Sequence, residues 1–161
     1  MIVRLTVEEV GRALNCAYER WSLSIRGGRQ DSIAKSWTEG ITAHYYGAIG
    51  ELALGKALGI YVPLHVNQFS GMAADLTDGG ADYEVRYRKS KQHDLIVRER
   101  DRDDRRYVLC CGEPPEVEVV GWINGGDAKQ EKYIQDYGGH GAAYFVPRGD
   151  LVAWTYTNSL S

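Results

Sequence analysis

The stretch ADYEVRYRKS, residues 81–90, alternates charged and apolar side chains. Successive side chains of a strand point to opposite faces. The pattern therefore predicts a strand with Glu84, Arg86 and Arg88 on one face and the apolar residues between them on the other. Such a strand needs neighbours, and the segments on both sides of it predict a sheet.

Residues 72–76 (MAADL) and 82–88 flank the sequence TDGG, whose Asp-Gly and Gly-Gly pairs are typical of hairpin turns. Residues 94–99 (DLIVRE) and 106–112 (RYVLCCG) predict a second hairpin around a charged turn. Further on, the chain is expected to form a strand at 116–123, a short helix at 125–137, and extended segments at 142–147 and 151–156.

Two helices are predicted before the strands. In the first, at about residues 7–25, Thr6 and Glu9 form a capping-box pattern ahead of apolar residues at helical spacing. The second is expected at residues 38–59, ending near Gly59. We therefore predict a single α+β domain over residues 1–161, with a central mixed or antiparallel sheet flanked by helices.

Composition limits the expected partners and cellular location of the protein. The chain has 161 residues and a formal net charge of −3, which argues against coating nucleic acid by bulk charge. Its three cysteines favour buried thiols in a reducing compartment over a disulfide framework, so a cytoplasmic location is expected. No stretch of sequence is long and apolar enough to span a bilayer, so no membrane partner is expected.

The predicted first hairpin places two carboxylates close together. Asp75 and Glu84 lie on adjacent strands, where they can share a divalent cation, and carboxylate oxygens suit Mg²⁺ or Mn²⁺. Arg86 points to the same side and can stabilise a phosphate or developing negative charge. Asp82 shares the parity of Glu84 and is an alternative first ligand. Glu51 adds an acid from the second helix, where a solvated position is the competing interpretation.

These residues resemble a known family. Glu51 in GELAL, Asp75 in AAD and Glu84 in EVR resemble the PD-(D/E)xK nuclease superfamily, which has the restriction-endonuclease-like fold, and in particular small bacteriophage proteins of that pattern. The segments DLIVR, YVL, VVGWI and GGDAK follow in order. The resemblance implies a nuclease-like core at about residues 40–155. It also implies metal binding by Asp75, Glu84 and the Val85 carbonyl, with Glu51 as an auxiliary acid.

The motif lysine of that family is Arg86 here, and arginine stays protonated and cannot act as a base. The resemblance therefore implies either a Mg²⁺- or Mn²⁺-dependent nuclease in which Arg86 stabilises charge, or a catalytically silent relative that binds DNA or a host protein. A homodimer is possible in either case, and a phage-encoded chain would act in the host cytoplasm. The residues expected to contact DNA are Arg88, Lys89, Lys91 and Lys129.

Overall fold

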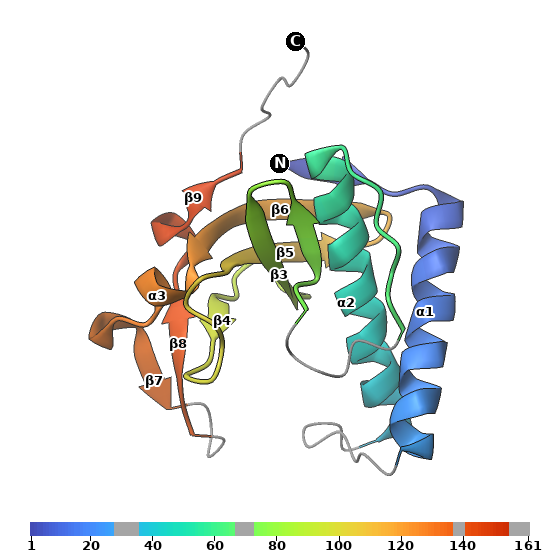
Figure 1. Ribbon diagram of the computed structural model, residues 1–161, viewed down its shortest axis with the longest axis horizontal. Helices are drawn as coiled ribbons and strands as arrows, with labels where there is room; N and C mark the ends of the chain where they lie inside the picture. The colour runs from blue at the N-terminus through green and yellow to red at the C-terminus, as the bar shows by residue number, and fades with distance from the viewer. Residues whose placement is uncertain (28–35, 67–72, 137–140, 155–161) are drawn as a thin grey trace.

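The computed structural model describes residues 1–27, 36–66, 73–136 and 141–154. Two long helices, α1 (Val7–Arg26) and α2 (Trp37–Leu58), run side by side in opposite directions (Figure 1). The side chain of Thr6 caps α1 in the predicted capping box, and Gly59 ends α2 with a φ of 71°. Both predicted helices are thus confirmed, with boundaries that differ by one residue.

Strands form a larger sheet with the order β1-β6-β5-β3-β2, in which β9 also pairs with β6. Its strands are β1 (Ile2–Arg4), β2 (Leu76–Asp78), β3 (Ala81–Arg88), β5 (Arg106–Glu113), β6 (Glu116–Asn124) and β9 (Val152–Ala153). β3 and β5 are parallel and the other pairs are antiparallel, so the sheet is mixed. The predicted first hairpin forms as β2–β3, but its first strand is Leu76–Asp78 rather than residues 72–76, and the turn is at Gly79 and Gly80. Asp75 therefore precedes the strand, and Met72 lies outside the described residues.

A second sheet has the order β4-β8-β7, with β4 (Leu95–Val97), β7 (Ile134–Asp136) and β8 (Ala142–Val146). The predicted hairpin between residues 94–99 and 106–112 is therefore wrong, because β4 pairs with β8. Residues 89–94 lead from β3 to β4 in the second sheet, the charged turn leads back to the larger sheet, and β5 pairs with β3 instead. The alternating pattern identified the strands but could not identify their partners.

The predicted short helix at residues 125–137 is correct only in part. This segment contains a four-residue helix, α3 (Gly125–Ala128), a 3₁₀ turn, η1 (Glu131–Tyr133), and then β7. A second 3₁₀ turn, η2 (Arg148–Asp150), precedes β9. The N-terminal strand β1 was not predicted, since its three residues are too few to show a period.

Two hydrophobic cores lie on opposite faces of β5. The larger one joins α1 and α2 to the sheet and includes Ile49, Val85 and Val108. The smaller one lies between the two sheets and includes Tyr107 and Leu109. β5 is thus covered on both faces, as expected for a strand with a nearly continuous apolar sequence.

α2 packs against β3 at Gly50. A Cβ atom at Gly50 would lie 2.7 Å from the Val85 side chain, so the absence of a side chain allows the close approach of helix and strand. This contact brings the next residue of α2, Glu51, toward the hairpin that carries Asp75 and Glu84. In the described residues, neither α1 nor α2, nor any shorter helix, is long and apolar enough to cross a membrane.

Candidate functional site

Asp75 lies immediately before β2 and is held by two backbone contacts. Its amide nitrogen donates to the Tyr83 carbonyl at 3.0 Å. Its carboxylate accepts a hydrogen bond from the Val85 amide at 2.8 Å. Asp75 is therefore fixed beside β3, and β3 is the strand that carries Glu84, the second predicted acid.

Glu84, in the middle of β3, is paired with arginines. One of its carboxylate oxygens accepts a short hydrogen bond from Arg105, and the other lies 3.3 Å from the Arg86 guanidinium. Arg105 is only 3% exposed and also donates to the Ala73 carbonyl at 3.1 Å. The charged turn between β4 and β5 is therefore not wholly exposed, because one of its arginines, Arg105, is buried against Glu84.

Arg86, two residues after Glu84 on β3, also has several partners. Its guanidinium lies 3.2 Å from Asp101 and stacks over the Tyr107 ring at 5.2 Å from the ring centre. Burial works against its charge, but Asp101 and Glu84 outweigh burial and raise the pKa of Arg86. Arg86 therefore carries a permanent positive charge beside Glu84, and its orientation is fixed by the loop that contains Asp101.

Glu51 is buried in α2 rather than solvated, at 6% exposure. Its two carboxylate oxygens accept hydrogen bonds from the Arg20 guanidinium of α1, at 2.7 and 3.1 Å. Arg20 also donates to the His65 carbonyl at 2.9 Å. This bidentate pair explains how an acid is accommodated among the small residues of α2.

The three acids share one electrostatic environment. Burial, followed by the negative charge of Glu51, raises the pKa of Asp75. Burial, followed by the charge of Asp75, raises the pKa of Glu84. The sequence had grouped Glu51, Asp75 and Glu84 from separate segments, and the structure brings them close enough to influence one another. We refer to these three residues with Arg20, Arg86 and Arg105 as the carboxylate–arginine cluster.

The cluster does not form a ready metal site. Across the described parts of the chain, no three acidic, histidine or cysteine side chains are arranged to hold a metal ion. The oxygen donors of Asp75 and Glu84 suit Mg²⁺ or Mn²⁺ in chemistry, but Glu84 is bound to two arginines. The Val85 carbonyl, the proposed third ligand, lies 3.5 Å from an Arg86 nitrogen.

Asp82, the alternative first ligand, lies at the exposed end of the hairpin. Its carboxylate accepts a hydrogen bond from the Thr77 hydroxyl at 2.7 Å. Asp75 is the acid whose charge most raises the pKa of Glu84. The electrostatics therefore group Asp75 with Glu84.

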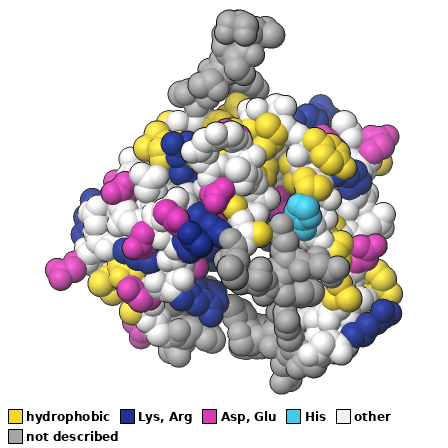
Figure 2. Space-filling view, viewed as in Figure 1, with side chains coloured by type: hydrophobic (Ala, Val, Ile, Leu, Met, Phe, Trp, Pro, Cys, Tyr) yellow, Lys and Arg dark blue, Asp and Glu magenta, His cyan; other side chains and the backbone are white. Residues whose placement is uncertain are grey.

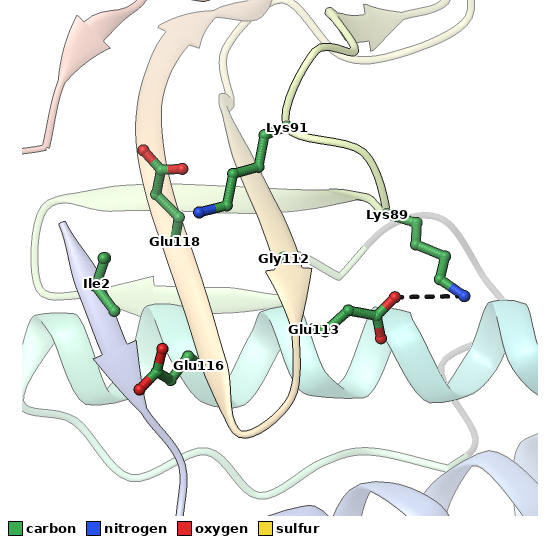
Figure 3. Close-up of a pocket in the computed structure, with 7 residues that line it drawn as sticks. All are labelled: Ile2, Lys89, Lys91, Gly112, Glu113, Glu116 and Glu118. Atoms are coloured by element: carbon green, nitrogen blue, oxygen red, sulfur yellow. Dashed lines mark ion pairs between the residues drawn. The ribbon is translucent and has the colours of Figure 1, made fainter.

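Two of the residues expected to contact DNA, Lys89 and Lys91, line one cavity, whereas Lys129 contacts the loop at residues 99–103. Arg88 ends β3 opposite Cys111, and Lys89 pairs with Glu113 at 3.3 Å. Lys91 lines a shallow cavity of about 330 Å³, where it points toward Glu118 (Figure 3). The ammonium of Lys129 lies elsewhere, 2.8 Å from the Glu99 carbonyl and 2.7 Å from Asp103.

Sequence reasoning did not identify the partners of the acids. Arg20 lies in a different helix from Glu51, and Asp101 and Arg105 appeared only as members of a charged turn. Their pairing depends on contacts between segments 15 to 31 residues apart. No local pattern in the sequence encodes such contacts.

Comparison of the chain with protein-family models, with curated proteins and with solved structures gives no match.

Proposed function

We propose that the protein is nuclease-like and acts on DNA phosphodiesters with Mg²⁺ or Mn²⁺, using the carboxylate–arginine cluster. The observation that carries the proposal is the convergence of Glu51, Asp75 and Glu84, from α2 and a hairpin, on one environment that raises the pKa of two of them. The proposal extends the resemblance to the PD-(D/E)xK superfamily, with its restriction-endonuclease-like core, to this fold.

In this proposal each residue of the cluster has a distinct role. Asp75, Glu84 and the Val85 carbonyl would hold the cation, and a bound Mg²⁺ would supply Lewis acidity and an activated water. Glu84 would have to release its contact with Arg105 to do so. Arg86, already charged and fixed by Asp101, neutralises the charge that develops on the phosphate. Glu51 stays on Arg20 and contributes negative charge that favours a cation.

A second candidate function is favoured by the pairing of the acids. Both oxygens of Glu51 and both oxygens of Glu84 are occupied by arginine nitrogens. A cluster already neutralised in this way has little need of a cation, and Arg86 replaces the motif lysine. The alternative is therefore a catalytically silent nuclease-fold protein that binds DNA or a host protein.

We further propose that the chain acts in the cytoplasm, which is the host cytoplasm if the chain is phage-encoded. Cys16, Cys110 and Cys111 are unpaired and buried in the described structure, in keeping with a reducing compartment. Arg88, Lys89, Lys91 and Lys129 remain the proposed DNA contacts. Contact of Lys89 or Lys129 with phosphate would require the ammonium to leave its acidic partner.

The test is cleavage of supercoiled, linear and single-stranded DNA with Mg²⁺, Mn²⁺ or EDTA. Glu84→Gln and Asp75→Asn keep hydrogen-bond acceptors for Arg105 and Val85 while removing the charge. Asp82→Asn is the matched control on the same strand. Metal-dependent cleavage that both variants lose and the control keeps would support the nuclease.

Absence of cleavage, together with no effect of either metal on the melting temperature, would contradict the nuclease. DNA binding then separates the remaining possibilities. Affinity that falls steeply with salt would support a silent DNA-binding protein. No DNA binding at low salt would favour a protein partner.

A further inference from the structure

Helix α1 carries an exposed apolar stripe that the fold does not use. Val7, Leu14, Tyr18 and Ile25 are 85%, 53%, 57% and 59% exposed. They are separated by seven, four and seven residues, and a helix turns about 100° per residue, so the four lie within about 20° of one line along the helix. Isolated exposed apolar residues are common, but four of them along one line of a helix are a candidate interaction surface.

A different side of α1 packs against the rest of the protein. Ala13, Cys16, Ala17 and Ser24 are buried, and Arg20 reaches Glu51 in α2. The stripe therefore lies outside the contact of α1 with the body of the protein. Figure 2 shows hydrophobic side chains at the lower right, over the C-terminal part of α1, with a basic side chain beside them.

We propose that this stripe binds the same stripe of a second copy of the chain, with the two α1 helices antiparallel about a two-fold axis at the level of Cys16. The positions of the stripe are symmetric about that level. Leu14 then lies opposite Tyr18 of the second copy, and Val7 opposite Ile25 of the second copy. An isologous contact requires such self-complementarity.

The middle of the stripe leaves room for a partner helix. Gly11 lies about 40° to one side of the line, and a Cβ atom there would meet nothing within 4 Å, so the space above it is open. Trp21 lies about 40° to the other side and forms an aromatic cluster with Tyr18 and Trp37, at ring-centre distances of 6.2 Å. In the proposed pair, Gly11 and Trp21 of the second copy lie at the same level on opposite flanks of the contact.

Charge determines the orientation. Glu8 and Arg26 lie on the same flank of the stripe, near opposite ends of α1, and both are exposed. A two-fold axis perpendicular to the helices places the same flank of both helices on the same side of the contact. Glu8 of each copy therefore approaches Arg26 of the other. A parallel pair would leave these charges 18 residues apart, or about 27 Å. The antiparallel arrangement therefore gains two complementary ion pairs.

Sedimentation equilibrium from about 1 to about 500 μM, a range that covers weak to moderate affinity, tests the pairing. We expect the wild type to approach twice its monomer mass of 18.0 kDa. Leu14→Glu should weaken association by at least about tenfold, since it places a charge in the contact. Ile134→Glu, at an exposed apolar residue of β7, is the control and should associate as the wild type does.

A wild type that stays monomeric throughout, or a dimer that Leu14→Glu leaves intact, would overturn the proposal. The orientation has its own test. Glu8→Arg and Arg26→Glu should each weaken association, and the double variant should restore it. Failure of the double variant, with circular dichroism showing α1 intact, would overturn the antiparallel pairing. The measurement detects mass alone, so its outcome is independent of the proposed nuclease function.

Discussion

The Val85 amide donates a 2.8 Å hydrogen bond to the Asp75 carboxylate. β2 begins only at Leu76, so the regular pairing of β3 with β2 stops before it reaches Val85. The Asp75 side chain supplies the acceptor that a longer β2 would have supplied through its backbone. Asp75 therefore has a structural role in the hairpin, whatever chemistry it performs.

Asp75→Asn should stabilise the protein at neutral pH. The pKa of Asp75 is raised by burial and by Glu51, so the ionised form is disfavoured in the folded state. Wild-type stability is therefore lost as the pH rises through the raised pKa. The variant is neutral and keeps an acceptor for Val85. Its gain in melting temperature should be absent below the ordinary aspartate pKa of about 3.9 and should grow toward pH 7.

Thermal unfolding of both proteins from pH 3 to pH 7 measures this gain. Asp75→Ala is the control, because it also removes the charge but leaves the Val85 amide without its acceptor, at a cost of about 1–3 kcal/mol. A melting temperature for Asp75→Asn below that of the wild type at pH 7 would contradict the inference that the ionised Asp75 carboxylate destabilises the folded state.

Gly50→Ala should destabilise the protein by about 1–3 kcal/mol, as expected for overpacking. The new methyl group would lie 2.7 Å from Val85 Cγ1 and 3.3 Å from Tyr87 Cδ2, which forces α2 away from β3. Gly47→Ala, in the same helix, meets nothing within 4 Å and should stabilise by up to about 1 kcal/mol. Urea unfolding of both variants measures the difference, and equal effects would show that the close approach is not required.

Arg20→Met should destabilise the protein by about 3–5 kcal/mol, because it leaves the buried Glu51 carboxylate without its bidentate partner. Adding Glu51→Leu removes the unpaired charge, so the double variant should recover most of the lost stability. Chemical unfolding of the two single variants and the double variant gives the coupling energy. If the double variant loses as much free energy of unfolding as the two single variants together, Arg20 and Glu51 are not strongly coupled.

Lys129→Met should release the loop at residues 98–104. The Lys129 ammonium contacts the Glu99 and Asp101 carbonyls and the Asp103 carboxylate. We expect faster amide hydrogen exchange in this loop, and a weaker hold of Asp101 on Arg86. Lys132→Met, which changes an exposed lysine paired with Asp150, is the control. Unchanged exchange in the loop would show that Lys129 does not hold it.

The local parts of the fold could be predicted because short-range rules govern them. Thr6 and Glu9 determined the start of α1, Gly59 the end of α2, and the Asp-Gly-Gly sequence the β2–β3 turn. The pairing of β4 with β8 and the parallel pairing of β3 with β5 could not be predicted. Alternation specifies which face of a strand is buried, but it does not specify which strand lies alongside.

The same division applies to the carboxylate–arginine cluster. The sequence by itself determined that Glu84 and Arg86 share a face, since strand geometry leaves no other arrangement, and it indicated Asp75 and Glu51 as the associated acids. Only the tertiary structure decided that Glu51 meets Arg20, that Glu84 meets Arg105 and that Arg86 meets Asp101. A buried charge must be paired, but its partner is selected by the packing of distant segments.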